Sequence, residues 1–214
     1  MEEKDVTNFG SSGWKEITGG LFSSALMGEG QWEAGDAGKV DDEMFTNLGA
    51  AGAYTACPDT ADVGDLAWVL QALKANYKLG GAVGDVAPWT SSAAGKWPLV
   101  RGKVGHPPGT ARTATGSGTA VELTAVSASQ YIYGALHVLS VSGTSTPTIT
   151  VKIQSDVDNT FGSPADQITF TAATAIGGQI SRTIGAITDT WWRAQWTITG
   201  TDPSFLFVVS FGVQ

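Results

Sequence analysis

The chain has 214 residues and a formal net charge of −8; 42% of its residues are hydrophobic and only 15% are charged. Its 12 Lys and Arg residues are too few and too scattered for a phosphate-binding stripe, which argues against a nucleic-acid-binding protein. The 28 glycines and the scarcity of helix-favouring residues indicate a β-rich chain with many turns.

Cysteine usage and hydropathy exclude further classes of protein. Cys57 is the only cysteine, which leaves no internal disulfide and no cysteine-based metal cluster and suits a reducing compartment. No apolar run approaches the roughly 20 residues that a membrane-spanning helix needs. The first residues, MEEKD, are acidic where a secretory leader would be basic, so we expect a soluble protein that is not exported by that route.

The first clear element is a short helix over 41–48. Acidic residues open the segment DDEMFTNLG, Met44, Phe45 and Leu48 share one side, and Gly49 is a stop signal.

The next segment, 64–81, is ambiguous. Its apolar residues fit the spacing of a helix slightly better than that of a strand, although a strand pattern interrupted at Gln71 also fits. Residues 89–93 and 99–105 are short strand candidates.

A stretch rich in Pro, Gly, Ser and Thr, HPPGTARTATGSGTA (106–120), separates the two halves of the chain and reads as a linker or long surface loop. We therefore expect a β domain over 1–108, a linker over 109–120 and an antiparallel β-sandwich domain over 121–214.

Period-two patterns dominate the second half. The segment 131–141 is apolar on both faces, which predicts a central strand, and 148–153, 168–170 and 180–184 are further strands. The segments 191–199 and 205–213 alternate apolar and polar residues on either side of GTDPS, so they predict an antiparallel hairpin. About six strands at this spacing are typical of a sandwich.

No motif in the chain predicts catalysis, a metal site or a cofactor site, so we expect no enzyme. His106 lies in the predicted linker, and His137 lies on a strand where a core histidine is the ordinary reading. DVDNTFG (156–162) resembles a calcium loop but lacks the turn glycine and the bidentate Glu, so its Asp156, Asp158 and Asn159 are expected to cap a turn.

Residues 5–105 carry a series of short motifs in a recognisable order. They are D-x-T-x-F-G at 5–10, G-L at 20–21, G-x-G-x-W at 28–32, the acidic helix, G-D-V at 84–86, W-x-x-x-A at 89–93 and L-V-R-G at 99–102. In this layout the chain resembles the major tail tube proteins of long-tailed, non-contractile phages. ALHV (135–138), ITFTAA (168–173), WWRAQWTITG (191–200) and the final FVVSFGV are similar to the extra sandwich that some of them, notably from actinobacterial phages, carry. Members of that family usually have a further strand pair ahead of the D-x-T step, which this sequence lacks.

The resemblance implies a fold and a function. The fold would be a tail-tube-type β-barrel or sandwich with a short helix, followed by a second antiparallel β-sandwich, with 66–79 as a strand. The protein would be a virion component, assembled in the host cytoplasm into stacked, hexameric rings of the tail tube. The ring would surround a tape-measure protein, meet a tail terminator, and conduct DNA during ejection without binding it specifically.

Charge supports that expectation, because six copies at −8 each would carry about −48 and would repel passing phosphates. Our candidates for the lumen-facing carboxylates are Glu16, Glu29 and Glu33, which could equally be solvated groups on the outer face.

Two other functions fit the same composition. One is a carbohydrate-binding sandwich of a phage fibre or surface protein, which would stack sugars on Trp191, Trp192 and Trp196, although tryptophans at this spacing more often fill a core. The other is a capsid decoration protein.

Overall fold

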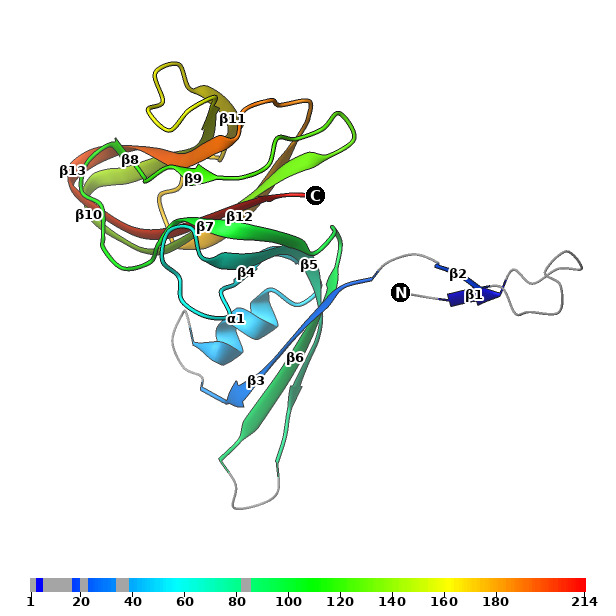
Figure 1. Ribbon diagram of the computed structural model, residues 1–214. Coiled ribbons are helices and arrows are strands. Elements are labelled where there is room, and N and C mark those ends of the chain that lie inside the picture. The colour runs from blue at the N-terminus through cyan, green and yellow to red at the C-terminus, as the bar shows by residue number, and fades with distance from the viewer. Residues whose placement is uncertain (1–2, 6–16, 20–22, 34–38, 82–85) are drawn as a thin grey trace, which may run out of the picture.

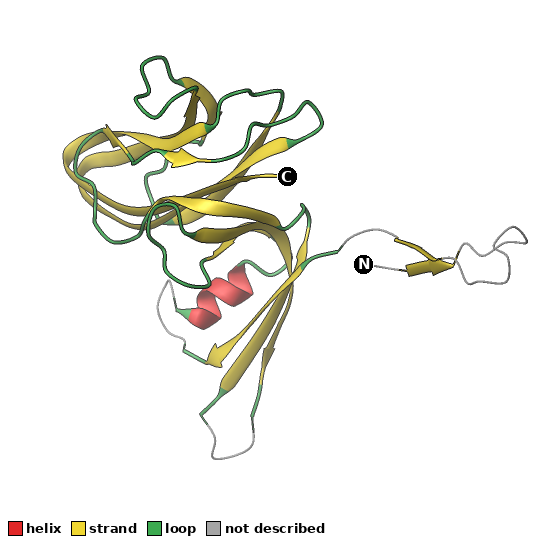
Figure 2. Ribbon diagram, in the orientation of Figure 1, coloured by secondary structure: helices red, strands yellow, loops and turns green. Residues whose placement is uncertain are grey.

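The computed structural model describes residues 3–5, 17–19, 23–33, 39–81 and 86–214. They form antiparallel strands with one short helix, so the expected mainly-β fold is confirmed (Figures 1 and 2). In chain order the elements are β1 (Glu3–Asp5), β2 (Ile17–Gly19), β3 (Ala25–Gln31), α1 (Val40–Thr46), β4 (Ala51–Ala56), β5 (Leu66–Leu79), β6 (Pro88–Gly95), β7 (Val100–His106), β8 (Gly116–Ser117), β9 (Val121–Glu122), β10 (Tyr131–Asp156), β11 (Ala165–Thr169), β12 (Gly177–Ile184) and β13 (Trp191–Val213).

The framework of the second half is a two-stranded ribbon made of β10 and β13. The two strands pair antiparallel from Ile132 opposite Val213 to Asp156 opposite Trp191. The register shifts between Val138 and Thr148, and Gly143 and Gly200 have φ values of 129° and 119°, which favour glycine and allow the ribbon to bend.

The predicted hairpin between 191–199 and 205–213 is therefore wrong. The two segments follow one another in a single bent strand, and β10 is the partner of both. GTDPS does change the direction of the chain, but the neighbouring segment of β10 bends with it, so the pairing continues through the turn residues.

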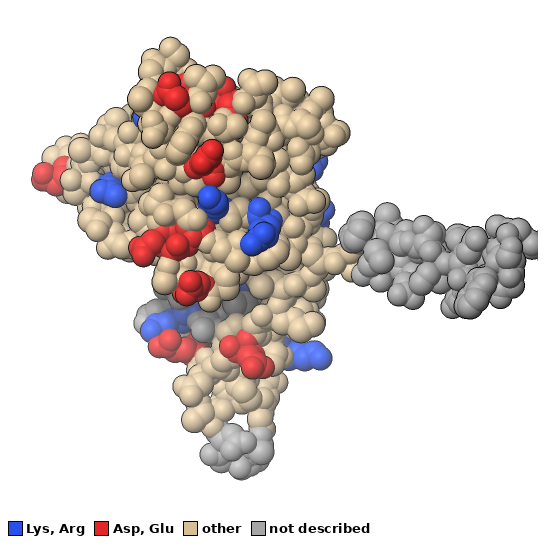
Figure 3. Space-filling model, viewed as in Figure 1, with Lys and Arg blue, Asp and Glu red and all other residues tan. Residues whose placement is uncertain are grey.

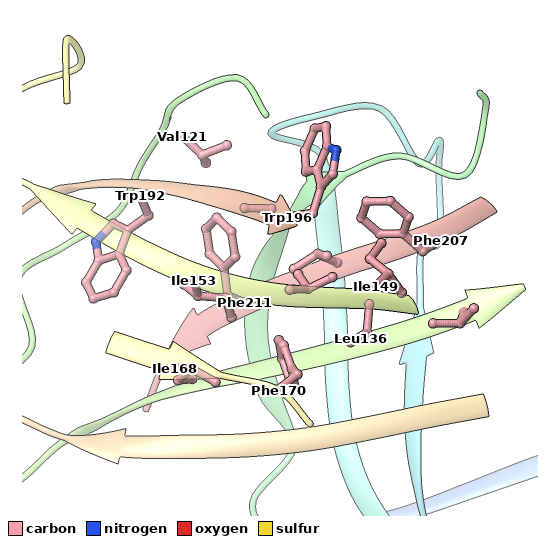
Figure 4. Packing of buried hydrophobic residues seen from close by; sticks show 14 of the residues in the cluster. Val121, Leu136, Ile149, Ile153, Ile168, Phe170, Trp192, Trp196, Phe207 and Phe211 are labelled. Carbon is pink, nitrogen blue, oxygen red and sulfur yellow. The ribbon is translucent and has the colours of Figure 1, made fainter. Parts of the chain in front are cut away.

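Both halves of the bent ribbon contribute to one apolar core, which is how a single ribbon produces a sandwich (Figure 4). Leu136 and Phe207 come from one half, and Ile149 and Ile153 come from the other. The fully buried members include four large side chains whose removal from water each contributes roughly 2–3 kcal/mol before entropy is counted. These four are Trp192, Phe205, Phe207 and Phe211.

The ambiguous segment 66–79 is the strand β5, as the resemblance implied, and the helical spacing was misleading. β4 pairs with β5 along one edge, while β6 and β7 pair with different parts of it. Pairing along so much of its length satisfies its backbone groups, and such long-range contacts outweigh a slight local preference for helix.

Strand pairing continues between the two halves of the chain. β7 pairs with β13, so the sheet that contains β5 is continuous with one layer of the sandwich. The predicted linker adds to the sheet as well, because Arg112 bridges to Phe205 and β8 pairs with β13. The division into domains at 1–108, 109–120 and 121–214 stays a prediction.

Candidate assembly surface

The sheet extends away from the sandwich as a three-stranded projection, which we call the strand arm (Figure 1). It consists of β3, β6 and residues 75–79 of β5. Within the described part of the chain, β3 pairs with β6 alone and is the last strand of its sheet. Its outer edge therefore presents unpaired backbone N–H and C=O groups, which a further strand could satisfy.

Two glycines shape the arm. Trp89 of β6 lies across Gly28 and Gly30 of β3, and a Cβ atom at these glycines would stand 3.2 Å and 3.0 Å from the indole. The two glycines of the G-x-G-x-W spacing therefore have a local cause, since a side chain at either position would crowd the indole of Trp89.

A shared carboxylate ties the far end of the arm to the helix. Asp41 Oδ1, at the start of α1, accepts a hydrogen bond from Tyr77 Oη at 2.8 Å and another from Trp32 Nε1 at 3.1 Å. Partial burial, followed by the hydrogen bond and the negative charge of Asp41, raises the pKa of the Tyr77 phenol. The predicted helix at 41–48 thus serves to hold β3 and β5 together.

One face of the arm is open and mixed in character. Met27 is 81% exposed, and it borders a hollow of about 480 Å³ together with Glu29 and Lys78. The remaining lining is mostly small and polar, namely Gly28, Asn76, Thr90, Ser91 and Ser92. Figure 3 shows acidic and basic side chains side by side on this view of the molecule, with no continuous basic stripe.

The three lumen candidates have different surroundings. Glu29 is exposed on β3, opposite Thr90, with no ion pair shown for it in the described structure. Glu33 lies just beyond β3 and forms an ion pair of 2.5 Å with Lys39, so part of its charge is neutralised locally. Glu16 lies outside the described residues. Whether any of them faces a lumen stays a prediction.

His106 is buried and His137 is half-buried, and both side chains have structural partners. His106 is 1% exposed at the end of β7, its Nδ1 lies 3.0 Å from Phe207 O, and Arg112 Nε donates to its Nε2 at 3.0 Å. Because Nε2 accepts, Nδ1 carries the proton and donates, and the ring is neutral. Burial lowers the pKa of His106 to about 4.

The expected position of His106 in the linker is wrong, because the residue is the last one of strand β7. Val100, Gly102, Val104 and His106 are buried at every second position, and that alternation was the available signal.

The hydrogen bonds of His137 link three strands, and they give the residue a structural role. Its Nε2 lies 2.9 Å from Thr55 Oγ1, which is also 3.1 Å from Ser210 Oγ. These atoms belong to β10, β4 and β13, and burial lowers the pKa of the imidazole.

The loop after β10 is held by its own carboxylates, as expected for Asp156 and Asp158. Asp156 accepts hydrogen bonds from the backbone N–H groups of Val157 at 2.7 Å and Ser163 at 3.0 Å, and Asp158 accepts one from Thr160 at 2.8 Å. Within the described ranges, no three His, Cys, Asp or Glu residues come together in a way that could hold a metal ion.

Of the three tryptophans considered for sugar stacking, Trp192 and Trp196 lie in the core, whereas Trp191 is half-buried. Trp192 is fully buried and Trp196 is 4% exposed, with its Nε1 donating to Ala114 O at 3.0 Å. Trp192 and Trp196 present no open face to a ligand, so the stacking role expected for these two is wrong, while that of Trp191 stays a prediction. Among the described residues, no helix is both long and apolar enough to cross a membrane.

No protein-family model matches the chain, and no curated protein matches it. Among solved structures it is similar to the crystal structure of the SPP1 Dit protein (gp 19.1), described as a paradigm of the hub adsorption apparatus in phages that infect Gram-positive bacteria. That similarity covers 100% of this chain and 88% of the other at 11% identity, with a TM-score of 0.30. A similarity this low carries no argument about function.

Proposed function

We propose that this protein is a structural subunit of a phage tail tube, which assembles with copies of itself into stacked, hexameric rings through which DNA passes. The observation that carries the proposal is the strand arm, whose outer edge has no partner strand among the described residues and whose open face exposes Met27. The resemblance of residues 5–105 to major tail tube proteins is the reason for proposing a tail tube and not another kind of assembly.

An open edge of this kind is a liability for a protein that works alone, because it invites pairing with other chains. A subunit that joins copies of itself turns the same edge into a binding surface, since the incoming strand satisfies the backbone groups. In this proposal the tape-measure protein, the tail terminator and the passing DNA are the further partners.

Electrostatics support passage without binding. The chain is strongly acidic, and exposed carboxylates such as Glu29 would repel DNA phosphates within the roughly 8–10 Å over which charge acts in physiological salt.

Negative-stain electron microscopy and light scattering of the purified chain test the proposal, with rings or tubes as the expected result. Replacing Met27 by Glu places a charge on an 81% exposed side chain and should reduce assembly without unfolding the subunit. The matched control is Val157→Glu, at a 70% exposed position in the loop after β10, which should assemble like the unmodified protein. A chain that stays monomeric at every concentration would contradict the proposal.

A further inference from the structure

The exposed end of β12 carries an aromatic cluster built around one arginine. The guanidinium carbon of Arg182 lies 4.5 Å from the ring centroid of Tyr131, 4.7 Å from that of Trp97 and 5.7 Å from that of Tyr133. Arg182 Nη1 donates to Tyr133 Oη at 3.2 Å, and the rings of Trp97 and Tyr133 meet edge to face at 5.8 Å. The rings hold the charged group in a fixed position at the surface.

An exposed aliphatic side chain borders this cluster. Ile184 is 53% exposed, lies two residues after Arg182 on the same face of β12 and pairs with Tyr131. We call Trp97, Tyr131, Arg182 and Ile184 the Arg182 patch. Trp, Tyr and Arg in a partly apolar setting are the residue types that contribute most to protein interfaces.

Asp42 and Phe45 of helix α1 and Leu48 of the turn after it form a surface of the complementary kind, which we call the α1 face. These residues are three apart and so share one side of the helix and its following turn. Phe45 is 70% exposed and Leu48 is 44% exposed, and neither belongs to the apolar clusters of the described structure. The sequence predicted that these apolar residues share a side, and the structure leaves that side open.

The two surfaces lie toward opposite ends of β12. Thr46 and Asn47, at the end of α1, line a groove of about 710 Å³ together with Gly177 and Gly178, where β12 begins. Arg182 and Ile184 lie at the other end, four to six residues further on, which is roughly 13–20 Å of extended chain. When one of these surfaces binds the other surface on a second copy, the contact is head-to-tail. Contacts of this kind generate rings when the rotation between copies closes.

We infer that the α1 face of one copy packs on the Arg182 patch of a second copy, with the Asp42 carboxylate facing the Arg182 guanidinium and Phe45 covering the aromatic rings. The charges are opposite, and each surface carries exposed apolar groups that the contact would remove from water. This inference rests on the proposed function, since it names a second contact between copies, in addition to the one at the strand arm.

Two single variants and their mixture test the contact. Phe45→Glu blocks the α1 face and Ile184→Glu blocks the Arg182 patch, and both positions are exposed, so the subunit should still fold. Each variant alone should need a concentration about tenfold higher or more for assembly, because an anchor at an interface contributes more than 1 kcal/mol. Val157→Glu is again the control, and sedimentation velocity is the measurement.

The mixture separates a head-to-tail contact from any other. Each variant keeps one intact surface of this contact, so equal amounts of Phe45→Glu and Ile184→Glu should form one-to-one pairs at concentrations where neither variant alone associates. The inference is overturned if both variants assemble like the unmodified protein, or if the mixture stays monomeric. In either case, rings formed by the unmodified chain would leave the proposed function standing. An unmodified chain that never assembles overturns both.

Discussion

The imidazole of His106 lies flat on the phenyl ring of Phe207, with ring planes 10° apart and centroids 4.1 Å apart. Trp196 meets the same imidazole edge to face at 4.9 Å, and Arg112 donates to it from the other side. This arrangement disfavours protonation of His106. A protonated ring could no longer accept the hydrogen bond of Arg112 at Nε2, and its positive charge would lie next to the guanidinium.

Acid should therefore destabilise the fold through His106. Its pKa is about 4 in the folded chain against 6.5 as the ordinary value, so the unfolded chain binds the proton more tightly. Stability should be full above pH 6.5 and fall as the pH drops toward 4, by about 2 kcal/mol between pH 7.5 and pH 5. His137, whose pKa is also lowered, acts with the same sign.

Urea unfolding at several pH values measures this effect. His106→Gln keeps a polar side chain that does not titrate, so it should be less stable at neutral pH and lose less stability on acidification. An unchanged slope in that variant would show that other groups cause the acid sensitivity.

The two buried tryptophans should respond differently to the loss of their N–H groups. Among the described residues Trp192 Nε1 has no hydrogen-bond partner, whereas Trp196 Nε1 donates to Ala114 O. Trp192→Phe should stay within about 1 kcal/mol of the unmodified chain, while Trp196→Phe should cost about 1–2 kcal/mol more than that. Calorimetric or urea unfolding of the two variants compares them directly, and equal costs would contradict the prediction.

Thr55 should be difficult to replace, because one hydroxyl serves both Ser210 and His137. Thr55→Val keeps the shape of the side chain and leaves two partly or fully buried polar groups without this partner, at a cost of about 2–4 kcal/mol. Thr55→Ser retains the hydroxyl and loses only a methyl group, so it should cost about 1 kcal/mol. The free energy of unfolding of the two variants is the measurement, and a Val variant as stable as the Ser variant would be the contrary result.

The effect of the Asp41 carboxylate on the pKa of Tyr77 should be measurable by titration. Asp41→Ala removes a hydrogen bond and a negative charge that both raise the pKa of the phenol, so Tyr77 should ionise at lower pH. Ultraviolet titration follows the change, and Tyr77→Phe identifies which step in the curve belongs to this residue. A Tyr77 step that does not move in the Asp41 variant would contradict the shared hydrogen bond.

Much of the second half was predictable because its strands alternate apolar and polar residues, as at Trp192, Ala194 and Trp196. The partner of each strand was not predictable in the same way. GTDPS specifies a change of direction, but whether the chain reverses into a hairpin or bends with its neighbour depends on β10, some fifty residues away.

The first half shows the same limit at the level of single elements. Local spacing favoured a helix at 66–79, and only pairing with β4, β6 and β7 makes it a strand. For the candidate site, the apolar side of the helix could be read from Phe45 and Leu48, but not the fact that nothing in the described structure covers it. The Arg182 patch combines residues from three separate segments of the chain, so no local sequence pattern could predict it.

The pairing of Ile132 with Val213 sets the order of events during synthesis. The sandwich cannot close until β13 has left the ribosome, so until then only β11 and β12 can pair with β10 in the partly made chain. Contacts so distant in the chain also form slowly, which favours aggregation at that stage. The apolar core of the sandwich is therefore completed only at the end of synthesis.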